Sequence, residues 1–280
     1  MKKRNILYII ISIICIVSII IAVYYQVFKP NRSNQISNQQ VQPTTVKENK
    51  LDLEKIKENF NMLFTNSFDD QGYDITSLKK INGLEDKNVI YSAYSIKEEN
   101  EKYNINLNIP VFNVDSEEAA KINAVTQKVF ADKANDIITK SESYTVYKID
   151  YVAYLNENIL SLVIKANLKE KDHAERLIVK TFNYDIDTGK TITLNELLNS
   201  YGIELKEVNK KIEEVITEAN KQADAVSSAI GKSVYKRDIN NAMYVTDNAG
   251  YFFVGLDGEV YILYPYGNSN YTSEIDIVVL

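Results

Sequence analysis

The hydrophobic and polar positions of residues 51–280 follow two spacings, one typical of strands and one typical of helices. From Tyr103 to Val111 apolar and polar side chains alternate strictly, which predicts a half-buried strand. Pro110 predicts either an edge position or the end of this strand, because proline cannot donate to a ladder. The turn sequences Asn156-Glu157-Asn158 and Asp257-Gly258 predict hairpins. Apolar runs between turn residues predict further strands at 89–96, 144–155, 159–168, 176–184, 191–194, 243–246, 251–254, 259–264 and 274–279.

Apolar residues recur at helical spacing in three other segments. Residues 51–64 carry one such stripe. A second helix is expected at 115–137, where Asp115–Glu118 form a capping sequence and the apolar residues after it keep helical spacing. A long helix is expected around 205–225. Strand runs interrupted by two long helices predict an α+β fold, in which the helices pack on antiparallel sheets.

The first fifty residues have a different pattern. Ile6 to Tyr25 is a run of 20 residues without a charge, and a helix of that length spans about 30 Å, the thickness of a bilayer core. No A-x-A site follows closely, so we expect an uncleaved transmembrane helix before the α+β domain. The expected order along the chain is a cytoplasmic start at 1–5, a transmembrane anchor at 6–28, a flexible linker at 29–50 and an extracellular domain at 51–280, with 51–143 and 144–280 as candidate subdomains.

Charges on the two sides of the apolar run predict its orientation. Lys2, Lys3 and Arg4 favour a cytoplasmic N-terminus, and Lys29 and Arg32 weaken that bias without reversing it. We therefore expect a single-pass protein of a cell membrane, with its C-terminal domain extracytoplasmic. The linker would reach roughly 25 Å as a flexible coil, which lifts the domain off the lipid surface.

Composition narrows the classes of function. One cysteine and one histidine exclude a disulfide framework, a Cys/His zinc site and a Cys–His nucleophile pair within one chain. The chain has 32 basic and 38 acidic residues, of which seven basic and one acidic residue lie in 1–50. Residues 51–280 therefore contain 25 basic and 37 acidic residues, which gives them a formal net charge of −12. This charge argues against nucleic acid as a partner and would steer a basic protein in a salt-dependent way. Solubility is the plainer explanation of the same acidity.

The segment from Asp185 to Lys190 is the most informative candidate for chemistry. Asp185 and Asp187 alternate as in a calcium loop, but Gly189 and Lys190 stand where that loop needs an oxygen ligand and a glycine. A tight turn explains the segment better, because aspartate caps turns and glycine accepts a positive φ. We therefore expect no metal and no cofactor.

The remaining candidates for chemistry carry weaker signals. Tyr264-Pro265-Tyr266, at the end of an expected strand, offers either a rigid aromatic binding surface or a corner packed on the sheet. His173 lies in a charged loop, and neither a phosphate loop nor a G-x-S-x-G motif occurs. We expect no enzymatic activity, although the 38 acidic residues leave a two-carboxylate hydrolase open.

Four stretches, spread over Tyr91 to Val279, carry a family resemblance. They resemble the extracellular domain family of unknown function shared by the anti-sigma-V factor, a lysozyme receptor, and the N-terminal region of some peptidoglycan deacetylases. Lys171–Ala174 departs from a Gly-Gly-Ala-His-like segment that the family often has. The stretches are Tyr103–Val111 with the helix containing Ile122-Asn123, then Ile159–Ile164, then Phe182–Leu194 with its Asp-x-x-Thr-Gly-Lys turn, and finally Tyr264-Pro265-Tyr266 with Ile275-Asp276-Ile277.

The resemblance implies a membrane-anchored binding or sensing domain whose partner is a basic protein such as lysozyme. An anti-sigma factor needs a longer cytoplasmic segment than five residues, so direct control of a sigma factor is not expected. A peptidoglycan-binding module and an uncharacterised carboxylate-dependent hydrolase stay open as alternatives. By resemblance or expected exposure, the candidate binding residues are Asp185, Thr188, Gly189, Lys190, Tyr264 and Tyr266.

Overall fold

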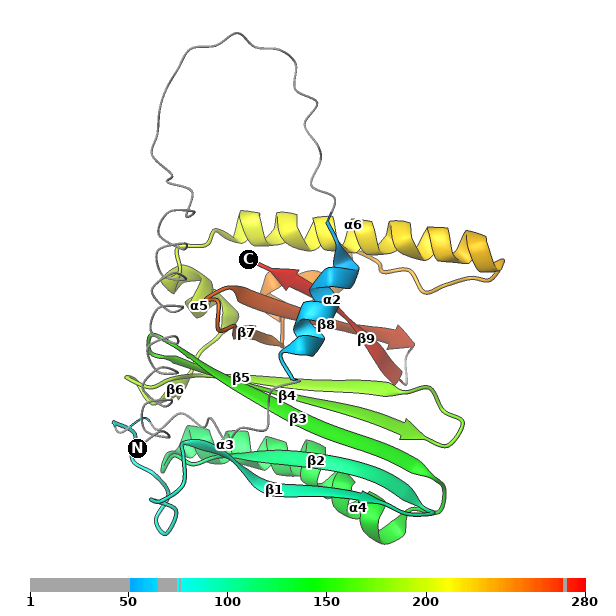
Figure 1. Cartoon of the computed structure of the whole chain (residues 1–280). Coiled ribbons are helices and arrows are strands. Elements are labelled where there is room, and N and C mark those ends of the chain that lie inside the picture. Colours follow the sequence, from blue (N-terminus) through cyan, green and yellow to red (C-terminus); the bar gives the residue numbers. More distant parts are fainter. Residues whose placement is uncertain (1–50, 65–74, 76, 269–270) are drawn as a thin grey trace, which may run out of the picture. The chain divides into compact units, whose positions relative to one another are not determined.

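The computed structural model describes residues 51–64, 75, 77–268 and 271–280, which belong to a unit beginning at residue 50 (Figure 1). The expected anchor and linker, 6–28 and 29–50, lie outside the described residues. Among the helices that are described, none is long and apolar enough to cross a membrane. The expected α+β class is confirmed, with two sheets and helices packed on their outer faces.

A six-stranded sheet forms the larger half of the unit. Its strands are, in spatial order, β1 (Ile90–Glu99), β2 (Tyr103–Phe112), β3 (Thr145–Asn156), β4 (Ile159–Glu170), β5 (Arg176–Asp185) and β6 (Lys190–Thr191). Neighbours pair antiparallel except β2 and β3, which run parallel from Tyr103 to Leu107. The sheet is therefore mixed, because the chain between β2 and β3 is a helical crossover. This parallel pairing joins residues of 51–143 to residues of 144–280, the two segments expected as candidate subdomains.

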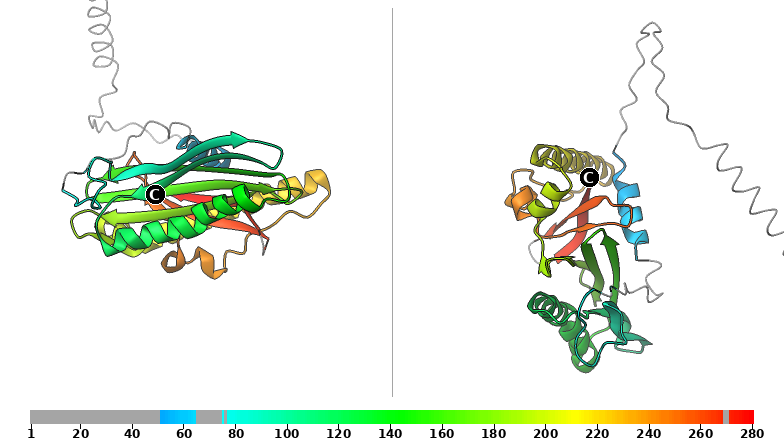
Figure 2. Two further views of the ribbon diagram at one scale, coloured as in Figure 1. Left: turned by 90° about the horizontal axis from the view of Figure 1, so that it is seen from below. Right: turned by 90° about the vertical axis from the view of Figure 1, so that its left-hand side faces the viewer.

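The crossover covers one face of the large sheet with α3 (Glu117–Thr126), a π-helical turn (Gln127–Ala131) and α4 (Asp132–Lys140). Seen from below in Figure 2, left, these helices lie across the strands. Ser116 begins α3, because its hydroxyl accepts the backbone N–H of Ala119 at 3.1 Å. The core beneath them contains Ile105, Leu107, Phe130, Ile149, Leu162 and Ile164.

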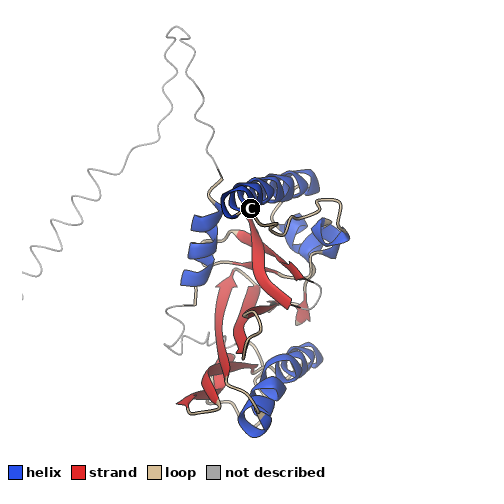
Figure 3. Ribbon diagram, turned by 90° about the vertical axis from the view of Figure 1, so that its right-hand side faces the viewer, coloured by secondary structure: helices blue, strands red, loops and turns tan. Residues whose placement is uncertain are grey.

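A second, three-stranded antiparallel sheet packs on the other face of the large sheet. It consists of β7 (Phe252–Val254), β8 (Val260–Asn268) and β9 (Tyr271–Val279). The helix α2 (Leu53–Met62) lies along the side of both sheets, as Figure 3 shows. The core between the sheets contains Phe60, Val163, Val179, Phe253, Leu263 and Ile277.

Polar side chains of the large sheet take the place of a ladder partner for β7. The Ser161 hydroxyl donates to Asn183 Oδ1 at 2.7 Å and accepts the N–H of Val254 at 3.1 Å. Asn183 Nδ2 donates to the carbonyl of Phe252 at 2.8 Å, and the N–H of Phe252 donates to Thr181 Oγ1 at 3.0 Å. These bonds fix the small sheet on the large one, since buried backbone groups left unpaired would cost free energy.

The outer face of the small sheet is covered by α5 (Leu194–Ser200) and α6 (Leu205–Ile230). The order of layers is therefore helix, large sheet, small sheet, helix (Figure 2, right). The expected helix around 205–225 is confirmed and extends five residues further, to Ile230. Its core with the small sheet contains Val208, Ile212, Val215, Ile262, Tyr264 and Val278.

Two expected strands are wrong. The strand expected at 191–194 stops at Thr191, because Thr193 and Glu196 form a capping box that begins α5. The strand expected at 243–246 is a pair of 3₁₀ turns at Ala242–Tyr244 and Thr246–Asn248. Pro110 lies inside β2 but beyond Leu107, the last residue that pairs with β3, so β2 has only β1 as a neighbour there and the proline takes an edge position.

Candidate functional site

The turn between β5 and β6 contains four of the sequence-predicted site residues. One carboxylate oxygen of Asp185, Oδ1, accepts the N–H groups of Asp187 at 2.9 Å and Thr188 at 3.2 Å, and Asn158 Nδ2 at 3.0 Å. Gly189 has φ +70°, as expected for a tight turn. Burial alone would raise the pKa of Asp185, but these hydrogen bonds hold it below its ordinary value. The turn is thus a rigid structural cap that leaves Thr188 and Lys190 exposed.

A second turn lies against this one, and a third lies against the second. Asn158, between β3 and β4, makes the bond to Asp185, and Asn156 Nδ2 donates to the carbonyl of Gly255, between β7 and β8, at 2.8 Å. Burial raises the pKa of Tyr201, which follows α5, and the nearby negative charge of Glu157 raises it further. Figure 1 shows β6 and α5 at this same, left-hand end. The interactions bring four separate segments of the chain together.

These segments form one surface, which we name the acidic end. It consists of the turns 156–158, 185–190 and 255–259 and the first turn of α5. Lys190 is exposed there, and Leu256 is 75% exposed between the carboxylates. An open depression of about 360 Å³ beside it is lined by the β5–β6 turn and by Glu117 and Glu118, both paired with Lys121. The exposed carboxylates of the acidic end are those of Glu157, Asp187, Glu196, Asp257 and Glu259.

The two tyrosines predicted as site residues do not form a surface corner. Tyr264-Pro265-Tyr266 lies inside β8, which continues to Asn268. Tyr264 is 2% exposed, and its ring centroid lies 5.3 Å from that of Tyr244 in the core under α6. Its expected exposure is therefore wrong, and burial raises the pKa of its hydroxyl. Tyr266 is half-buried and forms part of the wall of a pocket.

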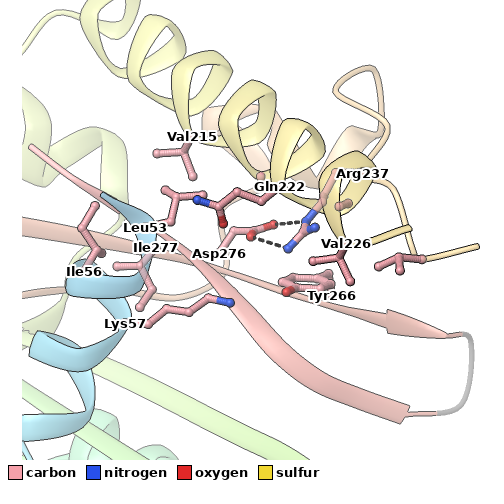
Figure 4. A pocket seen from close by; sticks show the side chains of 13 residues that line it. Leu53, Ile56, Lys57, Val215, Gln222, Val226, Arg237, Tyr266, Asp276 and Ile277 are labelled. Carbon is pink, nitrogen blue, oxygen red and sulfur yellow. Dashed lines mark hydrogen bonds and ion pairs between the residues drawn. The ribbon is translucent and has the colours of Figure 1, made fainter. Parts of the chain in front are cut away.

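That pocket, of about 150 Å³, lies between α2, α6 and the small sheet (Figure 4). Most of its lining is apolar, and its polar groups are Lys57, Gln222, Arg237, Tyr266 and Asp276. Arg237 Nε and Nη2 donate to the two carboxylate oxygens of Asp276, both at 3.1 Å. The two side chains are 8% and 2% exposed. The Arg237 guanidinium also lies 3.8 Å from the centroid of the Tyr266 ring.

The charged groups of the pocket are all paired with a group of opposite charge. Burial lowers the pKa of Arg237, but the bonds to Asp276 outweigh this effect and raise it, so the guanidinium stays charged. Lys57 bonds to Glu274 at 3.0 Å. Pockets for small molecules are typically about 300–1,000 Å³, so this one is too small for a metabolite. Its chemistry is that of an anchor, which ties the chain around Arg237 to β9.

The structure also locates the residues considered for metal binding and catalysis. No group of three or more His, Cys, Asp or Glu side chains that could hold a metal ion occurs in the described part of the chain. His173 lies exposed in the turn between β4 and β5. The pocket contains a single carboxylate, that of Asp276, whereas a two-carboxylate hydrolase needs a facing pair.

Sequence reasoning missed Arg237, and no local signal pointed to it, because its partner Asp276 is 39 positions away. Leu256, which is exposed in the turn between β7 and β8, was missed as well.

Comparison with known proteins yields structural likeness alone. No family model and no curated protein matches the chain. A DUF3298 family protein from Pseudomonas aeruginosa PAO1 matches 65% of this chain and 83% of its own, with 9% identity and a TM-score of 0.39. A DUF3298 family member from Bacteroides fragilis NCTC 9343 matches 64% and 80%, with 10% identity and a TM-score of 0.30. These neighbours belong to a family of unknown function, and nothing in them links the chain to the anti-sigma-V factor or to deacetylases.

Proposed function

We propose that the chain is a membrane-anchored, extracytoplasmic binding domain that receives a basic protein at its acidic end. The observation that supports this most is the convergence of exposed carboxylates on turns held together by Asn156, Asn158 and Asp185. A rigid surface on which one sign of charge predominates, here five carboxylates against Lys190, attracts a partner of the opposite sign and loses little conformational freedom on binding. Lysozyme, a strongly basic protein, is the partner that the family resemblance suggests.

The arrangement favours binding over catalysis. Its carboxylates stand on convex turns beside open solvent, where their charge can steer an approaching protein. Leu256, exposed between them, offers an apolar contact of the kind that anchors the centre of an interface, with polar groups at the rim.

The test is titration calorimetry of residues 50–280 with a c-type lysozyme at low and physiological salt. We expect a saturable one-to-one complex that weakens as salt rises. Replacing Glu157, Asp187 and Glu259 together with lysine should lower the affinity at least about tenfold, because these side chains carry charge without supporting the turns.

The matched control replaces Glu54, Glu58 and Glu213 with lysine, which changes the net charge by the same amount on α2 and α6. We expect it to lower the affinity less than about threefold. Equal losses in both variants, or no heat at either salt, would overturn the proposal. Binding to purified glycan strands in place of lysozyme would support the peptidoglycan-binding alternative.

A further inference from the structure

The apolar stripe of α6 continues past the body of the domain. Its earlier members, from Val208 to Ala223, are buried against the small sheet and α2. The same stripe then reaches Val226 and Ile230, three and seven residues after Ala223, at the spacing that keeps side chains on one helix face. Val226 is 48% exposed and Ile230 is 56% exposed. The stripe therefore ends on residues that the described part of the chain leaves about half exposed.

The segment after α6 is held in place. Gly231, with φ +66°, ends the helix, and the chain turns back along it. Asn220 bonds to both backbone groups of Arg237, accepting its N–H at 2.8 Å and donating to its carbonyl at 2.9 Å. The ring of Tyr235, which is 47% exposed, stacks on Tyr266 with centroids 5.8 Å apart. We name residues 225–237 the α6 tip.

The α6 tip also differs in charge from the rest of the domain. It contains Lys232, Lys236 and Arg237 between the flanking Asp224 and Asp238, in a domain whose formal charge is −12. Arg237 is neutralised by Asp276, and Lys236 pairs with Asp224 at 2.5 Å while both side chains stay more than half exposed. Exposed apolar and aromatic side chains beside lysines fit the boundary between acyl chains and anionic headgroups.

The chain that leads to the expected anchor leaves the domain beside the α6 tip. Leu53, the first residue of α2, lines the same pocket as Val226 and Val234 (Figure 4 labels the first two). The chain before α2 contains the uncharged run from Ile6 to Tyr25. The chain that leads to that run therefore leaves the described domain on the side that Val226 borders.

We propose that the α6 tip docks on the lipid surface of the membrane that anchors the chain. Val226, Ile230 and Tyr235 enter the interface, and Lys232 and Lys236 meet anionic headgroups. Because α6 has 26 residues and is about 39 Å long, the acidic end at its other terminus then faces away from the lipid. This inference rests on the anchor expected from the sequence and is independent of any basic partner.

The test uses the absence of tryptophan from the chain. The full chain carrying Tyr235→Trp is reconstituted into phosphatidylglycerol–phosphatidylethanolamine vesicles, with and without brominated acyl chains. We expect a blue-shifted emission and strong quenching by bromine, because the ring lies among the upper acyl chains. The matched control is Leu256→Trp, an exposed apolar position at the acidic end, which should emit as in water and resist quenching.

Two further measurements keep the proposal falsifiable. Adding Val226→Gln and Ile230→Gln to the Tyr235→Trp chain should abolish the emission shift and the quenching while leaving lysozyme binding unchanged, which separates this inference from the proposed function. Water-like emission from the Tyr235→Trp chain in vesicles would overturn the proposal. A dimer of residues 50–280 in light scattering that Ile230→Gln dissociates would also overturn it, in favour of a second copy of the chain as the occupant.

Discussion

The acidic end and the α6 tip are both exposed and held in place by side-chain contacts, yet they present different kinds of side chain. The acidic end presents carboxylates on turns that are held by side-chain hydrogen bonds to backbone groups. The α6 tip presents apolar side chains on a segment that is held by a buried ion pair and a ring stack. About 39 Å of helix separates them.

The difference shows that the exposed fraction of a side chain indicates a binding surface only when the contacts that hold its segment in place are also known. Scattered apolar residues on a surface need no explanation. At the α6 tip, however, they continue a core stripe and stand on a segment fixed by Asn220 and Arg237. At the acidic end, Glu196 and Asp257 help to hold their own segments, whereas Glu157, Asp187 and Glu259 stand on turns that other side chains hold. The two surfaces therefore suit different partners, and four predictions test that division.

The largest expected effect concerns the ion pair that holds the α6 tip. Replacing Arg237 with methionine leaves the carboxylate of Asp276 buried without a partner, so the free energy of unfolding should fall by about 3–5 kcal/mol. Urea unfolding of residues 50–280, followed by circular dichroism, measures this. Adding Asp276→Leu should restore most of the loss. A single-variant loss below about 1 kcal/mol would show that the pair does not hold the tip.

The second prediction exchanges one apolar side chain at each end. Leu256→Gln should weaken lysozyme binding about fivefold to tenfold and leave vesicle binding unchanged, because the two surfaces do not share residues. Ile230→Gln should do the reverse. Both variants are made in residues 50–280, which do not contain the expected anchor. Calorimetry with lysozyme and flotation with vesicles then measure the four effects. If either variant weakened both kinds of binding equally, the division between the ends would fail.

The third prediction concerns pH at the acidic end. The folded-state pKa of Asp185 lies below its unfolded value of about 3.9, so its charge stabilises the fold above that pH. This stability is lost as the pH falls through the folded pKa. Between about pH 5 and pH 2, the urea midpoint of Asp185→Asn should therefore decline less steeply than that of the natural chain. Parallel declines would show that Asp185 does not contribute.

The smallest expected effect is the coupling between the ends. Saturating lysozyme should change vesicle binding by less than about twofold, because sites this far apart act additively unless a two-state element joins them. Flotation with and without lysozyme measures the coupling. A larger change would sharpen the comparison, since the domain would then transmit binding at one end to the membrane at the other.

Much of the fold was predictable because its signals are local. The alternation over Tyr103–Val111, the Asn156–Asn158 turn and the stripe from Val208 to Ala219 each depend on neighbouring residues, and each predicted the right element. The failure at Thr191–Leu194 was also readable, because Thr193 and Glu196 spell a capping box. Tyr244 misled the strand prediction at 243–246, because a buried aromatic residue in a 3₁₀ turn has the composition of a strand.

The candidate site was less predictable, because its contacts join distant parts of the chain. The sequence identified the Asp185–Gly189 turn, whose bonds are mostly within four residues. It could not place Asn156 against Gly255, 99 positions away, or Arg237 against Asp276. Tyr264 and Tyr266 are two residues apart on one strand face, yet one is covered by Tyr244 and the other borders the pocket. Only the packing of the layers decides between those fates.

The bonds from Ser161, Thr181 and Asn183 to β7 have a consequence for how the protein behaves when concentrated at a surface. An outer strand with free N–H and C=O groups invites a strand from another molecule to pair with it, which begins aggregation. On β7, the outward N–H and C=O of Phe252 and the outward N–H of Val254 are already occupied by side chains of the neighbouring sheet. The small sheet is therefore closed to growth at this edge, so β7 does not template strand pairing between molecules.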